Sequence, residues 1–182
     1  MKRRMFLRVG MCVAVALLAG CCAPWAKEEP TPFGRLAVGV VRRLEIAREV
    51  AWAKAQTGAP VLDEEREKAV LAALVKQGEA AGLPKERVER FFGAQIAASR
   101  EAQTEWLAGW EAGTKERPKT VPLDLKTQIR PRLDAVGAEL IAALTEMPVL
   151  AEWDAGYRVW LKRALRQRGF SEAVSGLAAE GL

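Results

Sequence analysis

Apolar residues recur at helical spacing along most of this 182-residue chain, and that period limits its fold more than any other feature. The first clear stripe has members three or four residues apart, namely Leu36, Val40, Leu44, Ala47 and Ala51. Residues 33–182 are rich in Ala, Leu, Glu, Arg and Lys, which favour helices, whereas runs of β-branched residues are scarce. No alternating strand pattern competes. We therefore expect an all-α bundle of about six helices with short connections.

Turn and capping residues divide this helical region. Four longer helices are expected at residues 34–56, 63–81, 85–111 and 123–145. Asp63 can cap the second of them, because its carboxylate can accept backbone N–H bonds, and "GLP" at residues 82–84 fits a stop and restart. Pro131 predicts a kink or a late start in the fourth helix. Pro148 and the Gly169–Phe170 turn divide the remainder into a fifth helix and a short sixth.

The N-terminus has the pattern of a secretory signal, with a basic start, an uncharged apolar run over residues 9–19, and then small residues. The run is too short to span a bilayer as a mature helix. It ends in "LAGC", residues 18–21, which resembles a bacterial lipobox. In that motif the thiol of Cys21 would take a diacylglyceryl group and become the mature N-terminus. Ordinary cleavage near Ala26 is the alternative, which we favour less because "PWA" is a poor A-x-A site.

We therefore expect residues 1–20 to be a lipoprotein signal peptide, residues 21–32 a tether, and residues 33–182 a single all-helical domain. The protein is then expected in the periplasm, held to a membrane through a lipid on Cys21. Cys22, directly after the acylated position, is not an aspartate. By the usual sorting pattern this favours the outer membrane over the inner one.

The distribution of charge, cysteine and histidine excludes several kinds of function. The net charge is +5, from 28 basic and 23 acidic residues, but four of the basic residues lie in residues 1–20. What remains is nearly neutral and gives no support for nucleic-acid binding. The cysteines are Cys12, Cys21 and Cys22, and there is no histidine. Zinc sites built on Cys or His and Ser–His or Cys–His nucleophile pairs are therefore excluded from the helical region. We expect neither a metal nor a cofactor.

Two cations on the first expected helix share a face. Arg43 and Lys54 are eleven residues apart, so they differ by roughly 20° around the helix axis. Ala47 and Val50 lie between them on that face. Taken alone, each cation would lie on a solvated edge, because Arg and Lys are rarely buried unless they are paired.

Five more polar residues on the next two helices could meet these cations. Asp63, Arg66 and Glu67 occupy the first turn of the second helix, where acids suit the helix N-terminus. Ser99 and Gln103 share a face of the third helix. Each group alone has an ordinary structural explanation. Together the cations suit carboxylates, which Arg binds in a bidentate fork, and the acids can accept from a hydroxyl. The set predicts a site for a small hydroxylated dianion.

The stretches "RRLEIAREVAWAK", "PVLDEERE", "GLPKERVERFFGAQIAASREAQ" and "IRPRLD" resemble the all-helical class of chorismate mutases, specifically its secreted subclass. The resemblance covers roughly residues 35–134 well and the C-terminal helices weakly. It implies a chorismate mutase II-like fold and rearrangement of chorismate to prephenate, with no covalent intermediate and no cofactor. Two alternatives stay open: a non-catalytic periplasmic lipoprotein on a mutase scaffold, and a lyase that acts on isochorismate in the same cavity. A homodimer is one arrangement that the resemblance allows.

The resemblance also implies a role for each site residue. Arg43 and Ser99 would contact a substrate carboxylate. Lys54 would contact a carboxylate and the ether oxygen of the breaking bond, and Gln103 would donate to that same oxygen. Lys54 must stay protonated to act, which nearby Glu67 and the substrate carboxylates would favour.

The remaining roles concern the substrate's hydroxyl and its position. Glu67 would accept from the ring hydroxyl, with Asp63 nearby, and Arg66 would help to position the substrate. Intracellular members of the family are dimers that borrow one arginine from the partner's first helix. In the secreted subclass an arginine of the same chain replaces it, and Arg130 is the expected residue here, with Arg132 as its nearest competitor.

Overall fold

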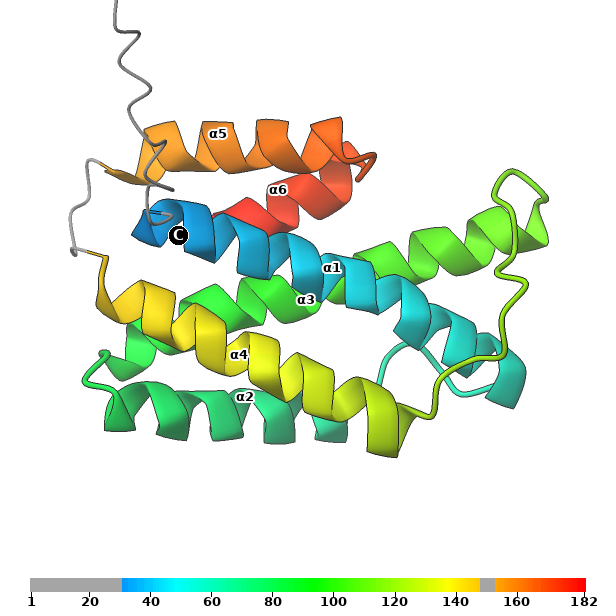
Figure 1. Cartoon of the computed structure of the whole chain (residues 1–182), viewed down its shortest axis with the longest axis horizontal. Coiled ribbons are helices and arrows are strands. Elements are labelled where there is room, and N and C mark those ends of the chain that lie inside the picture. Colours follow the sequence, from blue (N-terminus) through cyan, green and yellow to red (C-terminus); the bar gives the residue numbers. More distant parts are fainter. Residues whose placement is uncertain (1–30, 148–152) are drawn as a thin grey trace, which may run out of the picture.

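The long helix α1 lies at the centre of the molecule, where it packs against α3 and α4 (Figure 1). The helices are α1 (Pro32–Thr57), α2 (Glu64–Ala80), α3 (Lys85–Glu111), α4 (Arg130–Thr145), α5 (Trp153–Gln167) and α6 (Glu172–Glu180). Helix α2 lies along α3 and α4, while α6 packs on α3 and α5 covers α6. These six helices, with no strand, make up the secondary structure of the described part of the chain apart from one π-helical turn. The expected all-α bundle is confirmed.

This computed structural model describes residues 31–147 and 153–182. Residues 1–30, which include the predicted signal peptide, Cys21 and nearly all of the predicted tether, lie outside the described residues, as does Pro148. Within the described ranges, no helix combines the length and the apolarity that a membrane span needs.

Local sequence explains where the first two helices begin and end. The hydroxyl of Thr31 caps α1 by accepting from the backbone N–H of Gly34 at 3.1 Å. Gly58 ends α1 with φ of 68°, a left-handed conformation that suits glycine. Asp63 caps α2 as predicted, because its Oδ1 accepts from the backbone N–H of Arg66 at 3.1 Å. The turn between these two caps carries the residues that close one end of the site.

The fourth helix starts later than the range 123–145 suggests. A single turn of π-helix, η1 (Leu125–Ile129), precedes α4. Pro131 stands in the first turn of α4, where its missing N–H leaves no hydrogen bond unmade. Asp124 caps the π-helical turn by accepting from the backbone N–H groups of Lys126 and Thr127 at 2.9 and 2.7 Å. The expected late start of the α-helix is therefore confirmed.

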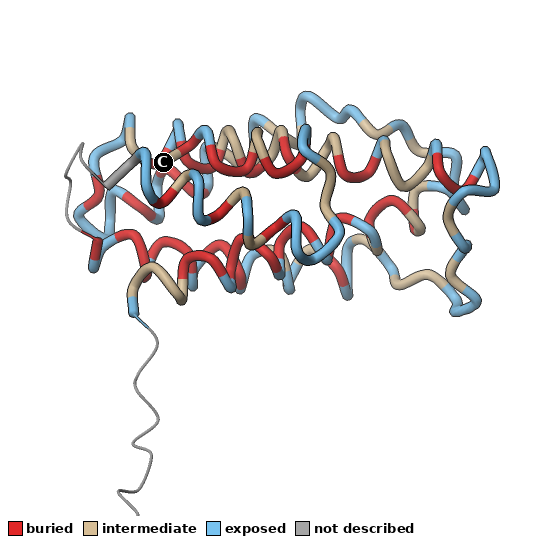
Figure 2. Tube along the Cα trace, turned by 90° about the horizontal axis from the view of Figure 1, so that it is seen from above, coloured by how far each residue is buried: buried red, intermediate tan, exposed pale blue. Residues whose placement is uncertain are grey.

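The predicted apolar stripe of α1 is buried, and Figure 2 shows buried positions along the inner sides of the helices. Phe91 and Phe92 of α3 are also almost completely buried and meet edge to face, with ring centroids 5.0 Å apart. At the C-terminus, the buried amide of Gln95 donates to the carbonyl of Ala178 at 2.8 Å, which joins α3 to α6. Helix α6 therefore supports the back of α3, whose other side carries site residues.

Candidate active site

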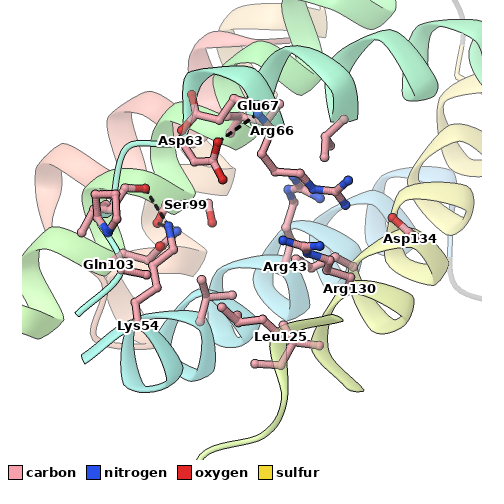
Figure 3. Close-up of a pocket in the computed structure, with 18 of the residues that line it drawn as sticks. Arg43, Lys54, Asp63, Arg66, Glu67, Ser99, Gln103, Leu125, Arg130 and Asp134 are labelled. Atoms are coloured by element: carbon pink, nitrogen blue, oxygen red, sulfur yellow. Dashed lines mark hydrogen bonds between the residues drawn. The ribbon is translucent and has the colours of Figure 1, made fainter. Parts of the chain in front are cut away.

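A cavity of about 260 Å³ lies among α1, α2, α3, η1 and the start of α4 (Figure 3). Its wall contains every residue for which a substrate-binding role was predicted, namely Arg43, Lys54, Asp63, Arg66, Glu67, Ser99, Gln103 and Arg130. Four helices that are well separated in sequence thus bring these side chains to one place. Their individual roles remain predictions, because the structure contains no substrate.

Arg43 is the most deeply placed cation of the site. It is only 5% exposed, so its position differs from the solvated edge expected of an isolated arginine. Its Nε finds no hydrogen-bond partner among the described residues. Burial lowers the pKa of Arg43 to about 10, although the carboxylate of Asp134 acts in the opposite direction. The guanidinium is therefore charged at neutral pH and has unused capacity to donate into the cavity.

Lys54 lies at the other end of the cavity and is half-buried. Its ammonium donates to the carbonyl oxygen of Val61 at 2.7 Å, which uses one of its three donors. The pKa of Lys54 is lowered, chiefly by burial. The carboxylates of Asp63 and Glu67 act to raise this pKa, and the guanidinium of Arg130 acts to lower it. The expected help from Glu67 is present, but desolvation outweighs it. The neighbouring acids thus favour the charged form of Lys54 as expected, but the net result is still a lowered pKa.

Gln103 and Ser99 form the neutral part of the wall. The amide nitrogen of Gln103 donates to the carbonyl oxygen of Ser99, one helical turn away, at 3.1 Å. An amide nitrogen has two N–H groups, so the second remains for a ligand. The amide oxygen of Gln103 is buried without a partner in the described part of the chain. Figure 3 shows Gln103 and Ser99 on the same side of the cavity as Lys54.

Three guanidinium groups gather on the opposite side of the cavity, those of Arg43, Arg66 and Arg130 (Figure 3). Arg132, the competitor of Arg130, is absent from the wall. It instead makes a two-pronged ion pair with Glu49 on the outer surface, in which Nη2 donates to Oε1 at 3.1 Å. The geometry therefore places Arg130, and not Arg132, at the site.

Two charged residues near the site were not predicted to contribute. Asp134 lines the cavity one turn after Arg130 and acts electrostatically on Arg43. Arg100, which follows Ser99, donates to the carboxylate of Glu67 at 2.9 Å. Both residues stand inside the motifs that carry the resemblance, but their sequence positions give no sign of their partners, since these lie on other helices.

The charges of the wall suit an anionic ligand. Four cations face three acids, Asp63, Glu67 and Asp134. Apolar side chains complete the wall, including Val50, Ile96, Leu125, Ile129 and Leu133. Among the described residues, no group of acids could hold a metal ion. Such a cavity can bind carboxylates at its arginine side, contact an apolar ring, and donate hydrogen bonds from Lys54 and Gln103.

An all-α bundle whose cavity carries arginines on one side is suited to bind a small anion. Comparison with known proteins shows which family the chain resembles. Residues 40–104 match the family model described as chorismate mutase type II. The chain is 28% identical over 140 residues to the secreted chorismate mutase of Mycolicibacterium smegmatis, which covers 76% of each chain. Over residues 40–104 the chain is therefore similar to chorismate mutases of type II.

Solved structures agree with this similarity. The chorismate mutase from Burkholderia thailandensis matches with a TM-score of 0.70 and 27% identity, over 83% of this chain and 96% of that one. The secreted chorismate mutase from Yersinia pestis has a TM-score of 0.69 over 81% of this chain and 94% of that one. Its 21% identity makes it a likeness of fold alone. Both matches thus cover more than four fifths of this chain.

Proposed function

We propose that this protein is a chorismate mutase, which converts chorismate to prephenate by an intramolecular rearrangement. The observation that carries the proposal is the convergence of Arg43, Lys54, Gln103 and Arg130 on one cavity of a chain that is similar to chorismate mutases of type II. The substrate is a hydroxylated dianion, and the wall offers cations for its carboxylates and acids for its hydroxyl.

The chemistry requires little covalent participation by the protein. The ether C–O bond of chorismate breaks while a C–C bond forms in the same molecule, with no nucleophile, no proton transfer and no redox step. Catalysis then consists of holding the substrate in a compact chair-like conformation and stabilising the charge that develops on the ether oxygen. A site without histidine or cysteine is sufficient for these two tasks.

The two sides of the cavity match these tasks. The guanidinium groups of Arg43, Arg66 and Arg130 hold the carboxylates, and thereby the conformation, of the substrate. On the other side, the Lys54 ammonium and the free N–H of Gln103 donate to the ether oxygen as negative charge develops there. The hydrogen bonds to Val61 and to Ser99 hold both donors before the substrate arrives, so little reorganisation is needed during the reaction.

Glu67, at the top of the cavity in Figure 3, accepts from the ring hydroxyl, and Asp63 borders it while capping α2. Ser99 contacts a carboxylate. All of these groups come from one chain, including Arg130, so the proposed site is complete in a monomer. Association into a homodimer stays a prediction that catalysis does not require.

The test is the ultraviolet absorbance of chorismate during incubation with the purified protein and no added cofactor, followed by identification of prephenate. Arg43→Ala and Lys54→Ala should lose most of the activity, whereas the exposed Arg90→Ala should keep it. No loss of chorismate with the wild type contradicts the proposal and supports the non-catalytic scaffold. Faster consumption of isochorismate with release of pyruvate would instead support the lyase.

We further propose that the protein is exported and anchored by a lipid on Cys21, in the outer membrane in preference to the inner one. The basic and apolar leader and the "LAGC" motif support this proposal, and a relative is named as secreted. Mass spectrometry of the protein from membranes should find a diacylated Cys21 as the first residue. A mature chain that begins near Lys27 and lacks lipid would contradict the anchor but not the export.

A further inference from the structure

The carboxylate of Glu67 is held from outside the cavity. Arg100 Nη1 donates to Glu67 Oε2 at 2.9 Å, in an ion pair that joins α3 to α2. Arg100 does not line the cavity; it lies in a shallow surface groove between these two helices. Glu67 belongs to the walls of both the cavity and the groove. The side chain of Glu67 therefore separates the two, and Arg100 contacts it from the solvent side.

We propose that Arg100 is a positioning residue that orients Glu67 for the substrate's hydroxyl group. A carboxylate can accept through both of its oxygens. With Oε2 bound to Arg100, the rotation of the group is restricted and Oε1 remains available on the cavity side. This inference rests on the proposed function, because the hydroxyl that Glu67 accepts from belongs to the substrate.

A second consequence concerns Lys54. The carboxylate of Glu67 acts electrostatically on the Lys54 ammonium across the cavity. Yet the ammonium binds the carbonyl of Val61, and no ion pair joins it to Glu67 within the described residues. An ion pair between the two would neutralise the cation that the ether oxygen needs and would close the space for substrate. By binding Glu67 on the far side, Arg100 keeps Lys54 free to meet the substrate.

Placement on α3 supports a specific role for Arg100 over an incidental surface contact. Ser99 and Gln103 point into the cavity, and Arg100, one residue after Ser99, leaves the helix about 100° further round, toward α2. The side chains of Glu67 and Arg100 are 26% and 41% exposed, so the pair is screened less than a fully exposed one. Glu64 and Lys68, which also line the groove, pair with each other, with N–O of 3.6 Å. The pair therefore does not share its partners with these neighbours.

The test compares kcat and KM for chorismate in five proteins: wild type, Arg100→Met, Arg100→Lys, Glu67→Gln, and Glu67→Gln combined with Arg100→Met. Arg90→Met is the matched control, since Arg90 is an exposed arginine of the same helix. Arg100→Met should lower kcat/KM about 10-fold, with a higher KM, and Arg100→Lys should recover part of the loss. In the Glu67→Gln background the same change should cost less than about twofold, because residues that act through one another are not additive.

The outcomes separate this inference from the proposed function. If the wild type does not consume chorismate, the proposed function fails and takes the inference with it. An active wild type with Arg100→Met equal to Arg90→Met overturns the inference alone. So does an equal loss from Arg100→Met with and without Glu67, because Arg100 would then act by another route. If Arg100→Met does not fold, Arg100→Gln, which keeps a hydrogen-bond donor without the charge, replaces it in the same comparison.

Discussion

The ammonium group of Lys54 and the carbonyl oxygen of Val61 are joined by a 2.7 Å hydrogen bond, which ties the last turn of α1 to the turn that leads into α2. This contact holds the proposed catalytic cation in place before any substrate is bound. It also links the helix that carries Arg43 to the segment that carries Asp63. Lys54 therefore contributes to the shape of the cavity as well as to its charge.

Replacement of Lys54 should be nearly inactivating. Loss of one donor to a developing oxyanion costs on the order of 3–4 kcal/mol, so Lys54→Ala should lower kcat by roughly 10²–10³-fold. The exposed Lys76→Ala on α2 is the control and should keep full activity. Steady-state kinetics and thermal unfolding of both variants give the measurement. A decrease below about 10-fold would show that Lys54 is not the principal donor.

The alkaline side of the pH profile should report the loss of positive charge from Lys54 and from Arg43, whose pKa is about 10. The active form of each is the cation, and burial lowers the pKa of Lys54 below the ordinary 10.5, so activity is lost at a lower pH than for an exposed lysine. The kcat/KM profile reports the free enzyme and should fall with a midpoint below 10.5. A bound dianion raises this pKa, so the decline in kcat should occur at higher pH. A kcat/KM midpoint at or above 10.5 would contradict this order of effects.

The buried charge of Arg43 should lower the stability of the free protein while it serves substrate binding. The reduction of its pKa from the ordinary arginine value to about 10 corresponds to a cost of about 3 kcal/mol for holding the charged form in the free protein. Since the folded pKa lies below the unfolded one, this cost is fully present at neutral pH. The cost is relieved only as pH rises above about 10, toward the ordinary pKa of arginine. Arg43→Met should therefore lose activity while its Tm stays equal or rises.

The measurement is a thermal melt of wild type and Arg43→Met at pH 7, without ligand and with saturating substrate analogue. The analogue should raise the Tm of the wild type and leave the variant unchanged, because only the wild type binds it. A Tm several degrees below that of the wild type would show that Asp134 already offsets the burial of Arg43 in the free protein.

Local structure was largely predictable, because caps and periodicity act within a few residues. The expected range 63–81 compares with the observed Glu64–Ala80, and the expected range 85–111 matches α3 at both ends. The π-helical turn at Leu125–Ile129 was not predictable. Its last residue, Ile129, is completely buried in the hydrophobic core, and such packing leaves no mark on local propensity.

The residues that line the cavity could be predicted from the sequence, but the contacts between them could not. Arg43 and Lys54 share a face on helical geometry alone, whereas the burial of Arg43 depends on α4 and could not be read from the spacing. The ion pair of Arg100 with Glu67 depends in the same way on how α3 lies against α2. The pKa of Lys54 is lowered because burial outweighs the nearby acids, a balance that requires knowledge of solvent exposure.

Alanine variants of Arg130 and Arg132 should differ clearly in activity. Arg130 lines the cavity, so Arg130→Ala removes a charge-assisted contact worth about 1.5–3 kcal/mol and should lower kcat/KM about 10–100-fold. Arg132 pairs with Glu49 at the surface, where such pairs contribute about 0–1 kcal/mol. Arg132→Ala should therefore stay within about twofold of wild type in activity. The reverse pattern would reassign the arginine of the site.

Two glycines near the C-terminus should respond in opposite ways to substitution by alanine. A Cβ on Gly181 would lie 2.8 Å from the Cα of Phe91 and 2.9 Å from its carbonyl oxygen, so α3 and the end of α6 would have to move apart. Such overpacking costs about 1–3 kcal/mol. A Cβ on Gly176, inside α6, meets nothing within 4 Å, and alanine favours the helix by about 0.8–1 kcal/mol over glycine.

Thermal or urea unfolding should therefore rank Gly176→Ala above wild type and Gly181→Ala below it. Activity should separate the same two variants, because α6 supports the part of α3 that precedes Ser99, and Phe91 lies two turns before Ser99. A shift of α3 by a few tenths of an ångström displaces Ser99 and Gln103 relative to Lys54, which should lower kcat in Gly181→Ala but not in Gly176→Ala. If both variants unfold and react like the wild type, the C-terminal helix does not hold α3 in position.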